Sequence, residues 1–443
     1  MKKVYVVCII GILLILFLNY KLEKIIIKKP LDKIVLMVDD AGEVDLGYMV
    51  IKKNKKYGII NTSGKYIKDP EYDLIKKISP EIYFLKSNNE KNIYNIKLDK
   101  ELKIDNFSYI GNELYKISLN DKCGIIDENL NIKVDIINDE IYSNNENILI
   151  LNEHEKYLLD KNFNKKILKN DYSDIQLGIG NYLYINSDNK YGIIDLDEIV
   201  KISPKYNELV NLNNKNILIG YIGKENYFIN LDKNIEKKIN YENYSMESMN
   251  RVMVLKNGKI GYINELGEEV ISTEYDGGFL YKEEKDFIQL KKEDSWYLLN
   301  LKTSKSKKIP FEDIGEYKDG LMVVKKEEKF GYIDKEGKIK IPLNYTIAED
   351  FNNGLAIVSS DKGFGVINKK GKRIIPLLYD EILIKDSYIY IKKDRKYGLY
   401  SKQGKEILPI IYDKLGRVSE DFIFFKNRNE TGLIKLNGEN NGN

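Results

Sequence analysis

Residues 329–342 read KFGYIDKEGKIKIP, and variants of this phrase recur from residue 57 to the end of the chain. Most copies contain a residue, usually apolar or aromatic, followed by glycine: Tyr57-Gly58, Cys123-Gly124, Tyr191-Gly192, Ile260-Gly261, Phe330-Gly331, Phe364-Gly365, Tyr397-Gly398 and Thr431-Gly432. Weaker copies at Tyr94, Leu158, Phe228 and Tyr297 complete a series with a mean period of about 34 residues. This periodicity predicts about twelve copies of one structural unit. Function is then expected from a surface that many copies build together.

The clearest copy, residues 321–351, shows what one unit contains. An apolar run at 321–324 and a second at 330–333 flank a charged connection, and a third run at 338–341 ends at Pro342. No window has the 3.6-residue period of an amphipathic helix. The sequence therefore predicts an all-β fold in which each unit is an antiparallel meander of three or four short strands.

Two recurring positions have the chemistry of tight turns. A second glycine follows the first by six residues, where a hairpin needs a positive φ; these are Gly64, Gly267, Gly337, Gly371, Gly404 and Gly438. Asn or Asp follows the first glycine by three residues, and such short side chains bond to the backbone of their own turn; these are Asn61, Asp127, Asp195, Asn264, Asp334 and Asn368. We interpret these carboxylates as turn caps and not as catalytic groups.

Two further positions have packing roles. Proline recurs eleven to thirteen residues after the first glycine, which suits a strand end or an edge strand; the prolines are Pro70, Pro204, Pro310, Pro342, Pro376 and Pro409. An aromatic residue recurs fourteen residues after the glycine and is predicted to pack between units; it is Tyr72, Tyr172, Tyr206, Tyr275, Phe311, Tyr345, Tyr379 or Tyr412. The first glycine itself is expected to leave room for a neighbouring ring or backbone.

The phrases at 329–342 and 396–409, with Tyr412-Asp413 following the second, resemble the bacterial WG repeats, also called KWG repeats. The resemblance covers about residues 33–443 and is strongest from Gly261 onward. It departs from the family in one respect, because Tyr, Phe or Cys stands where the family has tryptophan, and Trp296 lies in a weak copy. The resemblance implies a β-rich repeat of exported or surface proteins and implies no activity, cofactor or ligand.

The two ends of the array complement each other. Residues 33–51 align with 338–358, so the array begins partway through a unit, and it ends just after the turn containing Gly438. A propeller-like ring closed by its first and last strands would show this split. Because propellers usually have four to eight blades, an open superhelix and two six-unit rings also fit the count.

An apolar run at 4–20 precedes the array. It carries no charge and follows Lys2 and Lys3, and as a helix it would span roughly 25 Å. We predict a transmembrane anchor or signal segment over 1–20, a linker over 21–32 and a repeat domain over 33–443. An uncleaved anchor is favoured because small residues are absent after the run. The lysines beyond the run outnumber those before it, which leaves the orientation open, but export of the repeats is favoured.

Composition excludes several classes of function. Lys+Arg total 71 and Asp+Glu 68, and the charges are scattered, so no nucleic-acid partner is expected. His154 is the single histidine, which argues against a histidine metal site or a catalytic triad. Cys8 and Cys123 are not expected to pair. The Gly178-Ile179-Gly180 and Gly363-Phe364-Gly365 stretches lack the rest of a dinucleotide fingerprint, and Asp195-Leu196-Asp197 lacks the rest of a calcium loop.

The sequence thus predicts no catalytic, cofactor-binding or metal-binding residues. It predicts a membrane-anchored or exported binding module that presents an extended surface to a protein or glycan of the cell envelope. The repeat domain is expected on the cell surface or in the periplasm, or secreted if the segment at 1–20 is cleaved. The alternative is an exported hydrolase or lyase on a propeller-like scaffold, whose acids would gather at one rim.

Overall fold

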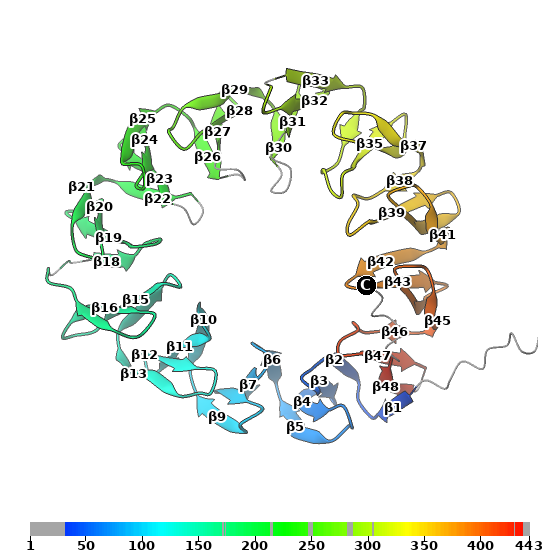
Figure 1. Ribbon diagram of the computed structural model, residues 1–443. Helices are drawn as coiled ribbons and strands as arrows, with labels where there is room; N and C mark the ends of the chain where they lie inside the picture. Colours follow the sequence, from blue (N-terminus) through cyan, green and yellow to red (C-terminus); the bar gives the residue numbers. More distant parts are fainter. Residues whose placement is uncertain are drawn as a thin grey trace, which may run out of the picture. The chain divides into compact units, whose positions relative to one another are not determined.

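The computed structural model describes residues 32–436 except 171, 173, 213–215, 247–250, 281–286, 304 and 429. In these residues every regular element is a strand, and the 48 strands form twelve four-stranded sheets with antiparallel pairing (Figure 1). The predicted all-β array of twelve meanders is therefore confirmed, with four strands in each. The predicted N-terminal helix lies outside the described residues, as does the linker except for Asp32, which already belongs to the first strand.

We number the sheets 1 to 12 in the order in which the chain enters them. Sheet 1 contains β2 (Asp40–Asp45), β3 (Tyr48–Lys53), β4 (Lys56–Asn61) and β5 (Tyr66–Tyr72). Sheet 2 contains β6 (Leu74–Lys77), β7 (Ile82–Ser87), β8 (Glu90–Asn95) and β9 (Lys100–Lys103). Sheet 3 contains β10 (Asn106–Gly111), β11 (Leu114–Leu119), β12 (Lys122–Asp127) and β13 (Ile132–Asn138). Sheet 4 contains β14 (Glu140–Ser143), β15 (Asn147–Leu151), β16 (Lys156–Asp160) and β17 (Lys165–Ile167).

The next four sheets continue the series. Sheet 5 contains β18 (Asp174–Leu177), β19 (Tyr182–Ser187), β20 (Lys190–Asp195) and β21 (Val200–Tyr206). Sheet 6 contains β22 (Glu208–Asn211), β23 (Ile217–Ile222), β24 (Glu225–Asn230) and β25 (Ile235–Ile239). Sheet 7 contains β26 (Asn243–Met246), β27 (Val252–Lys256), β28 (Lys259–Ile263) and β29 (Glu269–Tyr275). Sheet 8 contains β30 (Gly277–Leu280), β31 (Phe287–Lys292), β32 (Ser295–Asn300) and β33 (Lys305–Ile309).

The last four sheets include the one that joins the two ends of the described chain. Sheet 9 contains β34 (Asp313–Ile314), β35 (Met322–Lys326), β36 (Lys329–Ile333) and β37 (Ile339–Tyr345). Sheet 10 contains β38 (Ile347–Ala348), β39 (Leu355–Ser360), β40 (Gly363–Asn368) and β41 (Arg373–Tyr379). Sheet 11 contains β42 (Glu381–Lys385), β43 (Tyr388–Lys393), β44 (Lys396–Ser401) and β45 (Glu406–Tyr412). Sheet 12 contains β46 (Lys414–Leu415), β47 (Phe422–Asn427), β48 (Glu430–Lys435) and β1 (Asp32–Leu36).

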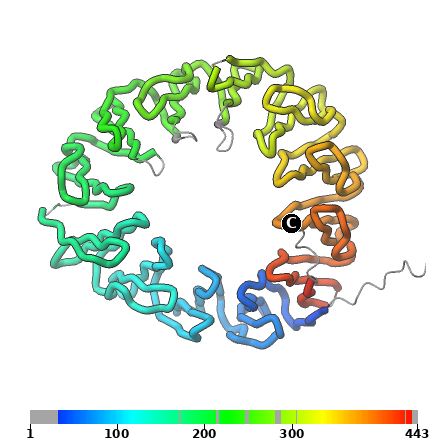
Figure 2. The backbone as a smooth tube through the Cα atoms, viewed as in Figure 1, coloured from blue at the N-terminus to red at the C-terminus, as the bar shows by residue number. Residues whose placement is uncertain are grey.

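The chain divides into two compact units. The first comprises the described residues of 1–73, 395–398 and 407–443, and the second comprises 74–394 and 399–406. In the second unit the chain passes from one sheet to the next in sequence order, so each sheet lies beside its sequence neighbours (Figure 2). No helix in the described part of the chain is long and apolar enough to cross a bilayer.

In the first unit, β1 completes sheet 12. It pairs with β48 from Asp32 opposite Lys435 to Leu36 opposite Thr431 (Figure 1). The Thr431 hydroxyl donates to the carbonyl oxygens of Leu36 at 2.6 Å and Val38 at 3.1 Å. The pairing confirms that the incomplete units at the two ends of the array complement each other.

Sheet 12 also packs against sheet 1 in this unit. Leu433 and Phe424 of sheet 12 share an apolar core with Val44 and Met49 of sheet 1. At the rim of this core Lys414 forms an ion pair with Asp40 at 2.7 Å. The two sheets are therefore held together by burial of apolar side chains, with charged contacts outside the core.

The cores of the second unit lie between consecutive sheets. Ile93 of sheet 2 packs with Tyr115 of sheet 3, and Tyr332 of sheet 9 packs with Val358 of sheet 10. Five of the recurring aromatic residues belong to these cores: Tyr206 is buried, and Tyr172, Tyr275, Phe311 and Tyr345 are half-buried. Tyr379 is also half-buried, and in the first unit Tyr72 is half-buried and Tyr412 is buried with its ring 5.6 Å from that of Phe425. Their predicted role in packing is confirmed, and each sheet needs its neighbour to bury its apolar face.

The turn residues also have the predicted geometry. The second glycine of the repeat has a positive φ at all five described positions, for example 74° at Gly337. The side-chain oxygen of Asp334 accepts hydrogen bonds from the N–H groups of Glu336 at 3.1 Å and Lys338 at 2.9 Å. Equivalent bonds are made by Asn61, Asp127, Asp195, Asn264 and Asn368. Gly438 lies outside the described residues.

The first glycine of the repeat lies under a bulge in the fourth strand. In sheet 9, Phe330 pairs with Tyr345 and Tyr332 pairs with Ile341, so three residues of β37 face Gly331 alone. A Cβ at Gly331 would lie 2.6 Å from the Ile341 carbonyl oxygen. The same register shift occurs in sheets 1, 3, 5, 7 and 10. The predicted close approach is therefore confirmed, and what approaches is the backbone of the fourth strand.

The bulge also explains where the prolines and the weak copies occur. Pro70, Pro204, Pro342 and Pro376 lie within bulged fourth strands, where no ladder hydrogen bond is lost. Sheets 2, 4, 6 and 8, which lack the first glycine, pair their third and fourth strands without a register shift. From sheet 1 to sheet 8, bulged and regular sheets thus alternate.

An aspartate after the bulged strand links a sheet to the next one. Asp276 accepts a hydrogen bond from Lys259 of sheet 7 at 2.5 Å and another from the Glu293 N–H of sheet 8 at 2.6 Å. These two bonds lower the pKa of Asp276 below its usual range. Asp413, which bonds to Lys396 and to the Arg428 N–H, has a lowered pKa for the same reason.

Acid is expected to weaken these links. Because the pKa values of Asp276 and Asp413 are lower in the folded chain than in the unfolded one, the stability that they contribute is complete above about pH 4 and decreases as the pH falls through the folded values. Burial raises the pKa values of Glu349 and Asp350. Protonation of these two carboxylates in acid therefore favours the folded chain and opposes the loss of stability. Urea unfolding at pH 7, 5 and 3 measures the balance, and we expect a lower midpoint at pH 3. In Asp276→Asn the decrease should be smaller; an identical decrease would contradict the role of this carboxylate.

Candidate functional site

Asparagine residues lie in the turns between the first and second strands of sheets 3 to 6. Asn112, Asn145, Asn181 and Asn216 lie in four consecutive turns of this kind, and Asn144 and Asn147 flank the second of them. We call these six residues the asparagine row. Turns favour asparagine because its amide can bond to nearby backbone and because it tolerates a positive φ.

The row joins the turns of neighbouring sheets. The Asn144 side-chain amide donates to the carbonyl oxygens of Gly178 at 2.7 Å and Gly180 at 2.8 Å. The Asn112 amide donates to the Asn145 carbonyl oxygen at 2.8 Å, and the Asn147 amide donates to the Asn181 side chain at 3.3 Å. Part of the row is therefore structural, and its backbone positions are fixed by contacts between repeats.

A pocket of about 920 Å³ lies beside the row in the second unit. Sheets 4 to 7 supply its walls, which are Ser143, Asn144, Asn145, Glu146, Leu177, Gly178, Ile179, Gly180, Tyr184, Asn211, Asn216, Ile217, Asn230, Asp232, Lys233 and Glu265. Tyr184 packs closely against Gly178, because a Cβ at Gly178 would lie 2.9 Å from the Tyr182 carbonyl oxygen and 3.2 Å from the Tyr184 ring. Two smaller hollows, of about 520 Å³ and 500 Å³, border Asn147 and Asn181.

Three of the four charged side chains of the pocket are held by specific partners. Lys233 forms an ion pair with Glu265 at 3.1 Å, and the Asn216 amide donates to Asp232 at 2.6 Å. With Glu146 included, the lining has three carboxylates and one ammonium group. The wall therefore has a negative formal charge, with amide groups between the charged side chains.

Three polar side chains of the pocket, those of Asn230, Tyr184 and Asn216, are wholly or partly buried. Asn230 is 3% exposed, donates to the Glu265 carbonyl oxygen at 3.0 Å and accepts from the Lys233 N–H at 3.2 Å. Burial raises the pKa of Tyr184, so its hydroxyl remains protonated at neutral pH. The Asn216 side-chain oxygen is buried and has no hydrogen-bond partner among the described residues. A buried acceptor without a partner is unusual in a folded protein.

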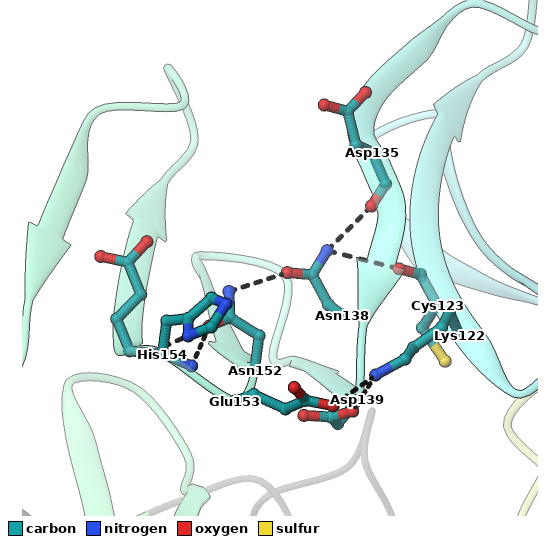
Figure 3. A network of polar contacts seen from close by, with 9 residues as sticks. Lys122, Cys123, Asp135, Asn138, Asp139, Asn152, Glu153 and His154 are labelled. Carbon is teal, nitrogen blue, oxygen red and sulfur yellow. Dashed lines mark hydrogen bonds and ion pairs between the residues drawn. The ribbon is translucent and has the colours of Figure 1, made fainter.

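His154 and Cys123, for which the sequence predicts no site role, make contacts that are local and structural. His154 is exposed, and its backbone N–H donates to the Asn152 side chain at 3.0 Å (Figure 3). The Asn152 amide in turn donates to Asn138 at 3.2 Å, which links sheets 3 and 4. Asn138 pairs with Cys123 at the register where other sheets pair two large side chains. Cys123 is a buried free thiol, so this Cys–Asn pair replaces aromatic packing by polar contacts.

The glycine and aspartate stretches have equally local roles. Gly178-Ile179-Gly180 forms a turn that lines the pocket, whereas Gly363-Phe364-Gly365 belongs to β40. Asp195 caps its own turn and forms an ion pair with Lys201 at 2.9 Å. Within the described ranges, no three His, Cys, Asp or Glu side chains gather as a metal site would require.

The asparagine row and the pocket were not predicted from the sequence. Asn112, Asn145, Asn181 and Asn216 do recur with nearly the period of the repeat, and this was a usable signal. It is hidden because asparagine is common in turns, and only the structure shows which turns adjoin a hollow.

The geometry defines an all-β repeat protein whose units are four-stranded meanders, with a hollow over several of them. Five segments match the family model described as WG containing repeat, at residues 57–89, 260–296, 330–362, 364–397 and 397–430. The chain therefore contains WG repeats at these five segments. The matched segments all begin at or next to a first glycine of the repeat.

The search of curated proteins found no match. Among solved structures, the chain is similar to PorZ, a bacterial surface component of the type-IX secretion system of Porphyromonas gingivalis, at 8% identity over 91% of this chain and 75% of that chain, with a TM-score of 0.21. A eukaryotic initiation factor matches at 10% identity over 88% and 98%, with a TM-score of 0.34. Kluyveromyces lactis Hsv2p matches at 13% identity over 51% and 92%, with a TM-score of 0.28. At these TM-scores the likenesses support no inference about function.

Proposed function

We propose that the chain is a non-catalytic binding module of the cell envelope. The observation that carries the proposal is the pocket beside the asparagine row, because four consecutive sheets supply its walls. A surface that several repeats build together is how repeat proteins bind partners. The partner is a protein or glycan of the envelope, and the apolar run at 4–20 tethers the module to the membrane with the repeats outside the cytoplasm.

The acids of the pocket favour binding over hydrolysis. Glycoside hydrolysis needs two carboxyl groups, one of which must donate a proton. Asp232 accepts a hydrogen bond from Asn216 and Glu265 forms an ion pair with Lys233, so both carboxylates are already engaged by neighbouring side chains. Glu146 alone remains, and one carboxyl group does not make a catalytic pair.

Capture from an envelope extract tests the proposal. The immobilised full chain should retain a discrete partner, and the double substitution Glu146→Arg with Asn181→Arg should abolish retention, because both side chains are exposed at the hollows. The matched control is Asp361→Arg with Gln403→Arg, which makes the same change of charge at exposed turns of other sheets. Equal retention by the two double variants would show that the partner binds elsewhere, and no retention by the parent chain would refute the proposal.

A further inference from the structure

We propose that the pocket beside the asparagine row binds a neutral oligosaccharide. This inference rests on the proposed binding function and names the class of ligand for the same site. Three properties of the lining carry it: its charge, the kind of polar group that it offers and the shortage of apolar anchors.

The charge of the lining disfavours anions. Glu146, Asp232 and Glu265 outnumber Lys233, which is itself engaged by Glu265. A phosphate, sulfate or uronate group would bring a further negative charge against this wall without a free cation to receive it. Acidic glycans, nucleotides and phosphorylated ligands therefore do not fit the site.

The polar groups match hydroxyl groups. A sugar hydroxyl both donates and accepts, and side-chain amides offer the complementary pair of functions. Among the described residues the buried Asn216 oxygen has no hydrogen-bond partner, so a hydroxyl that donates to it would satisfy a group that is otherwise costly. The Asn211 amide donates to the Tyr184 hydroxyl at 3.5 Å, and that bond does not use the hydroxyl proton.

Apolar anchors are too few for a typical polypeptide partner. Protein interfaces draw most of their energy from large buried aromatic and aliphatic anchors. In the pocket, Leu177, Ile179 and Ile217 are the aliphatic residues and Tyr184 is the aromatic one, against ten other polar or charged side chains. Smaller hollows continue from the pocket past Asn147 and Asn181, so a linear chain of sugar units can extend along the row.

An oligosaccharide array tests the inference. The purified full chain is applied in a polyoxyethylene detergent, which has no sugar head group, to neutral hexose and N-acetylhexosamine oligosaccharides and to sulfated and uronate-containing ones. We expect binding to neutral members only. Ile179→Trp, which fills the pocket, should weaken the Kd at least tenfold, and Asn216→Leu should weaken it through loss of the acceptor. Lys370→Trp adds the same ring to an exposed turn of sheet 10 and should bind as the parent does.

The outcomes separate the inference from the function on which it rests. Binding of acidic members alone, or neutral binding that Ile179→Trp leaves unchanged, would overturn the inference. If the array is blank but the envelope extract yields a partner that protease destroys, the binding function stands and the oligosaccharide is wrong. If neither experiment gives binding, both proposals fall. Urea unfolding of each variant verifies that a loss of binding is not a loss of folding.

Discussion

Replacing Gly331 by valine is expected to lower the free energy of unfolding by several kcal/mol, on the order of an overpacked core position. The physical reason is the bulge of β37, whose backbone leaves no room for a side chain. A Cβ at Gly331 would lie 2.6 Å from the Ile341 carbonyl oxygen and 2.9 Å from the Leu343 nitrogen, both backbone atoms that cannot rotate away. Urea unfolding followed by far-ultraviolet circular dichroism measures the loss.

The weak copies provide the matched control. Leu158 occupies the equivalent place in sheet 4, where it pairs with Lys166 in a ladder without a register shift. Leu158→Val removes one buried methylene and should cost about 1 kcal/mol. If Gly331→Val proved as mild as Leu158→Val, the close approach of the fourth strand would not be what requires glycine at this position.

Deleting residues 32–38 is expected to destabilise the first unit by about 5 kcal/mol, from the burial of Leu36 and Val38 together with the lost hydrogen bonds of β1. Both side chains are at least nine-tenths buried in the core that sheet 12 shares with sheet 1. The deletion also leaves β48 as an open edge, which favours association between molecules. Thermal unfolding and sedimentation velocity measure the two effects.

Addition of the missing strand as a peptide distinguishes strand pairing from general damage. A peptide of residues 32–38 should restore the unfolding midpoint and the monomer in the deleted protein, because β1 contacts the rest of its sheet through one edge. A peptide of the same composition in scrambled order should not. A deleted protein that is as stable as the parent would contradict the pairing of β1 with β48.

The sequence predicted the elements that depend on local chemistry. The turn at Gly337 and the cap by Asp334 could be identified because a positive φ and a short polar side chain have a local cause. The count of twelve units followed from the period, and the complementary ends followed from the alignment of 33–51 with 338–358. These features need no knowledge of which sheets lie side by side.

What the sequence did not predict depends on contacts between strands and sheets. The fit of Gly331 beneath a bulge is a property of two paired strands and is not visible in one of them. The weak copies therefore look like poor matches in the sequence, although they form a second kind of sheet that has no register shift. The pocket depends on which turns become neighbours, as Asn144 and Gly178 do. A turn residue in a sequence carries no sign of whether a hollow adjoins it.

The position of β1 in sheet 12 has a consequence for biosynthesis. Strand β1 must wait for its partner β48, which is translated about 400 residues later, whereas the cores between consecutive sheets can form as the chain grows. Contacts so distant in sequence form slowly, since a long loop must close before they are made. The slowest step of folding should therefore be the final docking of the two ends, and nascent chains that stall before β48 should carry an unprotected N-terminal strand that chaperones can bind.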